Sequence, residues 1–391
     1  MTLFKAAVCA LTGMILSAGP ALAGPTLEFG PEQQGKLQID YTGQFQLRYR
    51  DTGAGPDGTE SATEFGFRRN RIALMGAWGE HFSLYVQTEF LEFNNVSALS
   101  VGATDASTFQ LIDAAMRFKA NDHFNVWFGK FKYGFTRENL EACFNPLTLD
   151  RSLFIRAPYV VTRDLGVSVW GNLAGGLFQY RLDGMNGRDD ATLSPKSSLR
   201  YTARAHVSLL DPESGYGYKG TYLGEKKVLT VGAAYQYESG IAFADTVNNT
   251  GSVDYKAWTV DAFLEYPISG IGTFTVSGAY VEYDMGNAYK GPSPDPGTIG
   301  INGAKNGWYA KAGYMLPNLP LQLFGRAEQW TFAQLDGVFD QQLDSYSGGL
   351  NYYVRGQDLK VTAEYTTLSY DKPGTSGKDA SLFVFQLQLI F

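Results

Sequence analysis

The chain has 391 residues, of which 18% are charged, 14% are aromatic and 45 are glycine, and its net charge is -7. The high aromatic content excludes a disordered chain, and the negative total excludes a bulk basic surface for nucleic acid. Two cysteines and three histidines are too few for a disulfide scaffold or a histidine-based metal cluster, so we expect no cofactor and no metal site.

Residues 1–23 have the pattern of a secretory signal that is cleaved from the chain. Lys5 precedes an apolar run that ends at Ala18, and Ala21-Leu22-Ala23 forms a small-residue cleavage site before residue 24. Cys9 lies in this segment, so Cys143 is expected to be the only thiol of the mature chain. Residues 24–391 contain no apolar run long enough for a transmembrane helix, and we expect them to form a single domain.

Apolar and polar residues alternate without a break over 36–50: one face begins with Leu37 and Ile39, the other with Lys36 and Gln38. A strand of a soluble protein averages about five or six residues, whereas a tilted strand that crosses a bilayer needs about nine to eleven. The pattern recurs and predicts about sixteen strands, at 36–50, 65–78, 82–93, 108–119, 124–131, 163–171, 177–183, 198–210, 228–238, 255–266, 273–283, 307–316, 321–332, 344–355, 359–370 and 381–391.

The connections between these strands alternate between short and long. Short links occur near residues 79–81, 121–123 and 267–272, and longer links rich in Gly, Pro and Asp occur at 51–64, 94–107 and 284–306. Short turns at one rim and long loops at the other are typical of outer-membrane barrels. The segment 211–227 is the exception, because it falls where a short turn is due and is too long for one.

Three features favour a membrane barrel over a soluble all-β protein. Aromatic residues lie near strand ends on the apolar side, as expected for two interfacial girdles. Small residues such as Gly43, Ala203 and Gly278 lie at mid-strand on that side, where a compact core would need bulk. The chain ends on a strand whose last residue is Phe391, which resembles the terminal signature of outer-membrane barrels. The fold class predicted is all-β, a transmembrane antiparallel β-barrel.

Three stretches in the first half of the chain combine arginine, glycine and aromatic residues in a distinctive order. They are Phe67-Arg68-Arg69-Asn70-Arg71-Ile72-Ala73-Leu74, the run from Phe128-Gly129-Lys130-Phe131-Lys132 to Glu138-Asn139-Leu140, and Asp150-Arg151-Ser152 followed by Arg163-Asp164-Leu165-Gly166-Val167. In these stretches the chain resembles the phosphate-selective porin O and P family, convincingly over residues 36–210.

The resemblance implies a trimeric barrel of sixteen strands in the outer membrane of a Gram-negative bacterium, whose third external loop, about 131–162, folds into the lumen and narrows it. Arg and Lys line the route in the phosphate-specific members of the family. The second half of this chain departs from them because it lacks a dense lysine cluster. The resemblance therefore implies the fold more strongly than phosphate selectivity.

Arginine and lysine side chains on the polar faces are the candidate anion-binding residues of the pore. Residues two apart on a strand lie on the same face, with about 7 Å between their side chains, so Arg69 and Arg71 form one pair. Arg200 and Arg204 share a face elsewhere. Rings of such cations are what an anion pore needs, and arginine grips phosphate with two parallel hydrogen bonds. The full set is Arg69, Arg71, Lys132, Arg137, Arg151, Arg163, Arg200 and Arg204.

For any one of these arginines, pairing with an acid across strands is the simpler interpretation. Cys143 falls in the same loop, where a small packed side chain is a simpler interpretation than a redox role. No hydrolase, P-loop or metalloprotease motif is present, so we expect no enzyme activity.

The sequence therefore predicts a porin that passes small hydrophilic solutes through the lipid bilayer of the outer membrane, with a mild preference for anions and with phosphate as one candidate anion. Two alternatives remain open. A general or sugar-admitting porin would have Tyr and Trp as a stacking track in the lumen, and a structural sleeve for a partner protein would have a wide lumen of small polar side chains.

Overall fold

The computed structural model describes residues 24–91, 108–153, 162–187, 194–245, 248–284, 304–332, 342–371 and 378–391, so the predicted signal segment 1–23 lies outside the described residues. Short helical elements are η1 (Pro31–Gln33), α2 (Arg137–Leu140) and η3 (Ala174–Gly176), and no helix in these ranges is long and apolar enough to cross a membrane. The strands are β1 (Thr26–Phe29), β2 (Gly35–Ala54), β3 (Glu60–Trp78), β4 (Phe82–Leu91), β5 (Thr108–Asn121), β6 (Phe124–Lys132), β7 (Arg163–Leu173), β8 (Phe178–Met185), β9 (Arg200–Ser208), β10 (Val228–Ala242), β11 (Val253–Ile268), β12 (Gly272–Asp284), β13 (Ala304–Met315), β14 (Leu321–Phe332), β15 (Gln342–Arg355), β16 (Leu359–Tyr370) and β17 (Ala380–Ile390).

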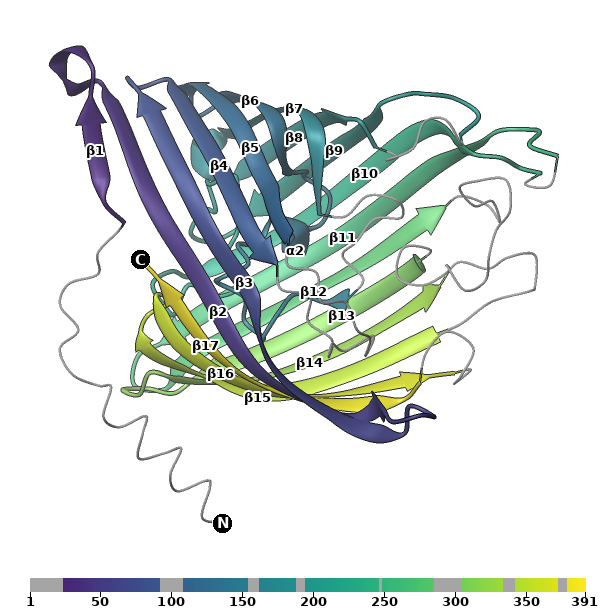
Figure 1. Ribbon diagram of the computed structural model, residues 1–391. Coiled ribbons are helices and arrows are strands. Elements are labelled where there is room, and N and C mark those ends of the chain that lie inside the picture. Colours follow the sequence, from purple (N-terminus) through teal and green to yellow (C-terminus); the bar gives the residue numbers. More distant parts are fainter. Residues whose placement is uncertain are drawn as a thin grey trace.

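Strands β2 to β17 form one closed antiparallel sheet (Figure 1). Each strand pairs with its neighbours in the chain, and β17 pairs with β2 from Leu382 opposite Arg50 to Ile390 opposite Thr42. Closure gives every strand two partners, which is the condition for a sheet to cross a bilayer without unpaired backbone groups. The predicted antiparallel barrel of sixteen strands is confirmed.

One strand was not predicted. β1 pairs with the beginning of β2, with Thr26 opposite Gln38 and Phe29 opposite Gly35. It occupies the stretch of β2 that lies beyond the last pairing with β17, which is Thr42 opposite Ile390. Four residues are too few for an alternation to stand out in the sequence, which is why this strand was missed.

The first long hairpin also differs from its prediction. The segment 51–64 was expected to be an external loop, but β2 extends to Ala54 and β3 begins at Glu60. The ladder continues through Arg48 opposite Glu64 and Arg50 opposite Ala62, so most of this segment is strand. Gly and Asp residues concealed it, because these residue types are usually depleted in strands.

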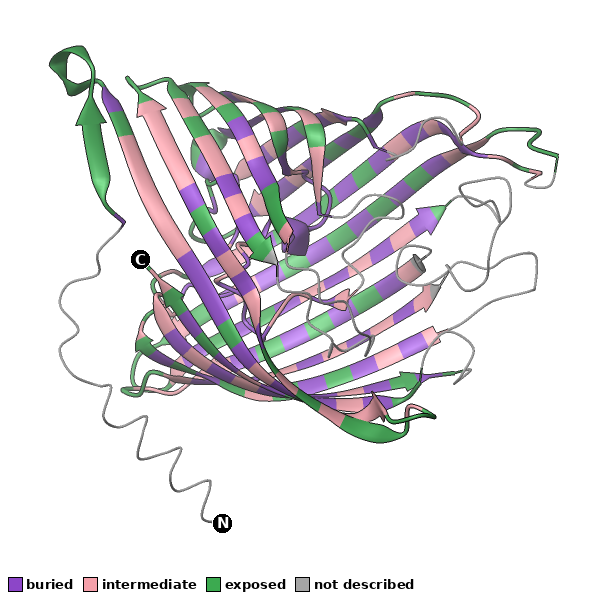
Figure 2. Ribbon diagram, viewed as in Figure 1, coloured by how far each residue is buried: buried purple, intermediate pink, exposed green. Residues whose placement is uncertain are grey.

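The two faces of the wall are inverted relative to a soluble protein, and Figure 2 shows the resulting alternation along each strand. On β11, Val260 is 47% exposed whereas its neighbours Thr259 and Asp261 are buried. On β2, Phe45 is exposed between the buried side chains of Gln44 and Gln46. An apolar outer face with a polar interior suits lipid outside and water inside.

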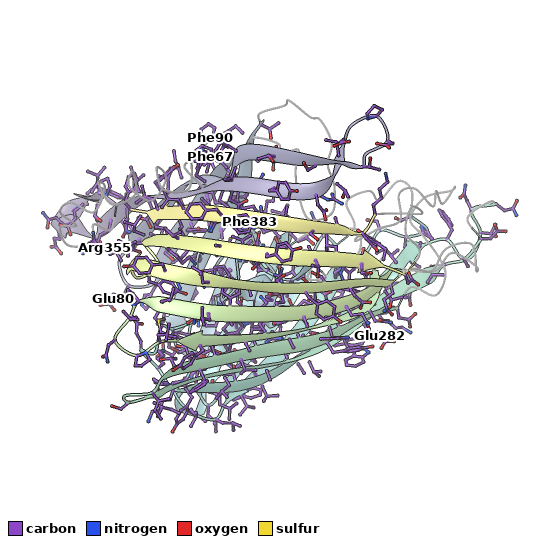
Figure 3. The ribbon with its side chains drawn as sticks, turned by 90° about the horizontal axis from the view of Figure 1, so that it is seen from below. Phe67, Glu80, Phe90, Glu282, Arg355 and Phe383 are labelled. Carbon is purple, nitrogen blue, oxygen red and sulfur yellow. The ribbon has the colours of Figure 1, made fainter. Side chains whose placement is uncertain are left out.

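Aromatic side chains form two bands on the outer wall. One follows the strand ends that carry the short turns and includes Trp78, Phe82, Phe124 and Phe274; the other follows the opposite ends and includes Tyr49, Phe65, Phe90, Trp258 and Trp308. In Figure 3, Phe67, Phe90 and Phe383 lie on the outer wall, Glu80 and Arg355 lie at the short-turn rim and Glu282 lies toward the opposite rim. Bands at both ends are the expected interfacial girdles.

Replacing Val260, at the middle of β11, by arginine is expected to destabilise the barrel by about 2–4 kcal/mol, the cost of a cation at the bilayer midplane on a lipid-facing position. Ile271→Arg is the control, because Ile271 is equally exposed but lies in the short turn before β12. Its expected cost is about 0–1 kcal/mol. Denaturant unfolding in lipid vesicles measures both, and equal costs would contradict a lipid-facing β11.

Candidate functional site

Residues 133–153, the described part of the loop between β6 and β7, contact inward-facing side chains around the barrel; we call them the inner loop. Residues 154–161 of the expected constriction loop lie outside the described residues. The anchoring bonds run from the Arg137 amide to Asp261 of β11, from Leu153 N–H to Glu328 of β14, from the Asn351 side chain of β15 to the Leu147 carbonyl, from Leu149 N–H to Glu364 of β16 and from the Gln388 side chain of β17 to the Phe144 carbonyl. These contacts with five strands place the inner loop inside the ring, where Figure 1 shows α2.

The inner loop begins with a capped turn of helix. The hydroxyl of Thr136 accepts a hydrogen bond from the Asn139 amide at 2.9 Å, which caps α2. Within α2, the Glu138 carboxylate accepts hydrogen bonds from the amide and the hydroxyl of Ser152 and pairs with Lys311 of β13. One buried carboxylate therefore joins the start of the inner loop to its end and to the wall.

Five of the predicted cations lie around the Cys143 side chain, and we call Arg69, Arg71, Lys132, Arg151 and Arg163 the Cys143 cluster. Arg71 makes a two-bond pair with Glu89, at 2.8 and 2.9 Å, and its other terminal nitrogen lies 2.9 Å from the Cys143 sulfur. The Gln44 side chain donates to the Cys143 carbonyl at 3.3 Å. The thiol is thus held by the guanidinium of β3 on the inner wall.

Asp150 neutralises a second part of the cluster. Arg69 pairs with one oxygen of Asp150 at 2.8 Å, and Arg68 pairs with the other at 2.6 Å. Strict alternation would turn Arg68 away from the lumen. The pairing of β2 with β3 contains a one-residue bulge here, because Gln44 lies opposite Arg69 whereas Phe45 lies opposite Phe67. The bulge turns the two consecutive arginines, Arg68 and Arg69, inward. Sequence reasoning missed Arg68 because a bulge leaves no mark in the alternation.

The remaining members of the cluster differ in their partners. Arg163 shares its Nε between both oxygens of Asp113, each at 2.9 Å. Lys132 donates to the carbonyl of Glu141, and Arg151 donates to the carbonyl of Asn139 at 3.4 Å. Lys132 and Arg151 hold the loop backbone through neutral oxygens, so the cluster contains more cations than carboxylates.

Two other predicted cations meet at Asp261. Arg204 binds it through both terminal nitrogens at 2.7 Å, and the Arg137 amide donates to the same carboxylate at 3.1 Å. The Arg137 guanidinium pairs with Glu213, and both guanidiniums lie over the ring of Tyr218, at 4.7 Å for Arg137 and 5.8 Å for Arg204. This arrangement is a buried scaffold of charge pairs and an aromatic ring.

Arg200 lies apart from both groups. It pairs with Glu238 at 2.9 Å and covers the ring of Tyr255 at 4.4 Å. Six of the eight predicted cations therefore have a carboxylate partner, which agrees with the simpler interpretation of each arginine. Arg200 and Arg204 are almost fully buried and neutralised.

Most described Tyr and Trp side chains on the inner face are buried, whereas Tyr85 and Trp127 are half-buried beneath the guanidinium of Arg117. Tyr255 and Trp330 are fully buried, and Tyr309 is 2% exposed. They pack with Phe135 and Leu140 of the inner loop in one apolar cluster. In the part of the chain that the structure describes, these residues anchor the inner loop and do not form an open stacking track.

The electrostatics of the inner loop favour charged forms at Cys143 and Asp150. Burial alone raises the pKa of the Cys143 thiol, but Arg71, Lys132, Arg69 and Arg151 together hold it well below its ordinary value. Burial likewise raises the pKa of Asp150, and Arg68, Arg69 and Arg151 hold it well below its usual range. The sequence marked Cys143 only as a packed residue, because its partners come from distant segments.

Comparisons with known proteins identify the architecture. The family model for phosphate-selective porin O and P matches residues 39–262, more than half of the chain. No curated protein sequence is close enough to this one to count as a match.

Several solved structures share the fold. The outer membrane channel DcaP of Acinetobacter baumannii is 15% identical with a TM-score of 0.60, over 95% of this chain and 100% of that chain. The anion-selective porin from Comamonas acidovorans is 8% identical with a TM-score of 0.58, over 91% and 100%. The trimer form of OmpT of Vibrio cholerae is 14% identical with a TM-score of 0.51, over 91% and 99%. At these identities the likeness shows the fold alone.

Cys143 is expected to be a thiolate in the folded protein at pH 7, whereas in the unfolded chain it titrates near about pH 8.5. Because the folded pKa is the lower one, the thiolate stabilises the fold fully above the unfolded value, and this contribution is lost as the pH falls through the folded value. Thiolate absorbance of the folded protein against pH, with Cys143→Ser as the blank, measures it. Absorbance that appears only near about pH 8.5 in the folded protein would contradict the low pKa.

Proposed function

The chain belongs to the phosphate-selective porin O and P family, and from this premise we propose that it is an outer-membrane channel through which small hydrophilic solutes diffuse passively, anions in preference to cations. The outer-membrane location in a Gram-negative bacterium follows the family and the barrel. Removal of residues 1–23 on export, narrowing of the lumen by the loop 131–162, and assembly as a homotrimer belong to the same proposal. The trimer form of the similar OmpT supports the last point.

The anion preference is supported by the position of the positively charged side chains that are not fully buried. Among the described residues, eleven buried Arg and Lys side chains are matched by eleven buried Asp and Glu side chains. Four half-buried cations, Arg68, Lys132, Arg151 and Arg163, lie around Cys143 and the half-buried Asp150. Half-buried groups remain open to water and solute in the lumen, so they set the field that a passing ion meets.

The balance of partners divides the predicted site residues into two roles. Arg137, Arg200 and Arg204 are paired and buried, and we propose that they form the scaffold of the lumen. Lys132, Arg151 and Arg163, with Arg68 added, are proposed to attract anions; Arg69 and Arg71 fix Asp150 and Cys143 beside them. An arginine fork binds phosphate and carboxylate equally well, so both belong in the test.

The two alternatives receive less support. A sugar-admitting porin would need a track of exposed aromatic rings in the lumen, whereas most described inward Tyr and Trp side chains are buried and the half-buried Tyr85 and Trp127 are covered by Arg117. A sleeve for a partner protein would need an empty lumen, whereas the inner loop occupies it.

Arg68→Gln is expected to lower the anion-to-cation permeability ratio, and Asp150→Asn is expected to raise it. A unit charge about 6 Å from an ion in a water-filled lumen contributes about 0.7 kcal/mol, so each change is expected to be about threefold. The measurement is the reversal potential of single channels in planar bilayers under a salt gradient, followed by titration with phosphate and with a small dicarboxylate.

Lys130→Gln is the matched control, because Lys130 is exposed and shares its face of β6 with the exposed Phe128 on the outer wall. Its reversal potential is expected to equal that of the unmodified protein. Shifts of the same sign in Arg68→Gln and Asp150→Asn, or no shift in either, would contradict the proposed anion preference.

A further inference from the structure

The connection between β9 and β10 is unlike the other turns at its rim. The turns after β3 and β5 have two or three residues, whereas this connection runs from Leu209 to Lys227. Its base is closed by the Asp211 amide, which donates to the Lys227 carbonyl at 2.8 Å. The residues between these two leave the rim, and we call 211–227 the rim insert.

Two tyrosines of the rim insert contact the inner face of the barrel. Tyr216 stacks on Trp127 of β6 with ring centroids 3.8 Å apart, and its hydroxyl donates to the Lys132 carbonyl at 2.8 Å. Tyr218 is 1% exposed, and its hydroxyl donates to Gln179 of β8 at 3.3 Å. These contacts hold the insert against the inner wall below the inner loop.

The backbones of the rim insert and the inner loop are hydrogen-bonded to each other. Ala142 N–H donates to the Tyr218 carbonyl at 3.0 Å, and Tyr218 N–H donates to the Leu140 carbonyl at 3.2 Å. Gly220 N–H then donates to the Asn145 carbonyl at 2.9 Å. A Cβ at Gly220 would lie only 2.7 Å from the Leu147 nitrogen, so the close approach requires glycine.

A buried ion pair joins the same two segments. The terminal nitrogens of Arg137 lie 2.5 and 2.7 Å from the two oxygens of Glu213. The hydroxyls of Tyr222 and Thr230 donate to the same carboxylate at 2.6 and 2.9 Å. The carboxylate is therefore fully hydrogen-bonded, which is the condition under which a buried ion pair holds its geometry.

The inner loop needs such support. Its helix α2 has four residues, far fewer than an isolated helix requires for stability in water. Its conformation depends on contacts with the wall and with the rim insert, and Arg137 is the residue of α2 whose side chain pairs with an acid of the insert. We propose that the rim insert is a second inward-folded segment of the channel, which clamps the inner loop through Glu213 and Arg137 and thereby sets the conductance.

The proposal needs only the channel and not its ion preference. Glu213→Gln keeps the shape of the side chain but removes the two-bond carboxylate partner of the buried Arg137 guanidinium, which keeps only the longer 3.7 Å contact with Glu141. Single-channel recordings are expected to show a second conductance level, with the time spent in it raised at least about tenfold, the effect of about 1.4 kcal/mol of lost support. A variant in which 213–224 is replaced by a short Gly-Ser turn is expected to have a higher mean conductance.

Glu225→Gln is the matched control, because it makes the same chemical change in the same insert at an exposed side chain. It is expected to conduct like the unmodified protein. The heat-modifiable mobility of each variant on gels verifies that the barrel has folded. The double variant Arg137→Gln with Glu213→Gln is expected to be steadier than Glu213→Gln alone, because the guanidinium that has lost its two-bond partner is removed as well.

The clamp would be overturned if Glu213→Gln and the shortened variant both had the same conductance and current noise as the unmodified protein. The reversal potential in the same recordings reports the ion preference separately. A normal reversal potential with new conductance levels supports the clamp, and an altered reversal potential with unchanged noise overturns the clamp alone.

Discussion

The closure of the sheet between β17 and β2 is the constraint on which the rest of the structure depends. A closed wall in lipid must present apolar side chains outward, as Val260 and Phe45 do, so the polar side chains of every strand are directed into one interior. Burying that many charges is tolerable only if each finds a partner. The lumen is consequently organised by ion pairs, much as a soluble protein is organised by its apolar core.

This constraint explains why most inward arginines are paired with carboxylates. Arg204 on Asp261 and Arg71 on Glu89 are two-bond pairs whose charges cancel and whose geometry fixes neighbouring segments. In the proposed function, the half-buried side chains set the field that an ion meets, and the fully buried pairs form the scaffold. The same residue type is thus proposed for two roles, which are distinguished by exposure to the lumen, since Arg163 is half-buried although it pairs with Asp113.

The fold could be read from the sequence, because period-two alternation and the rhythm of short and long connections are local signals. The strand number and the inward face of Arg69, Arg71, Arg200 and Arg204 followed from it. Ion-pair partners could not be predicted, since Glu89, Asp150 and Glu213 meet their arginines through strand register and loop packing. Arg68 was missed because of a one-residue bulge, and β1 because it is short. The segment 211–227 was recognised as too long for a turn, but nothing local indicated that it folds inward.

The contacts between the inner loop and the rim insert differ in sequence separation from those between the inner loop and the wall. Arg137 and Glu213 are 76 residues apart, whereas Leu149 and Glu364 are 215 residues apart. Closing a longer stretch of chain costs more conformational entropy, although the cost grows slowly with length. The rim insert is therefore a support for the inner loop that costs less chain entropy than the bonds to β14, β15, β16 and β17.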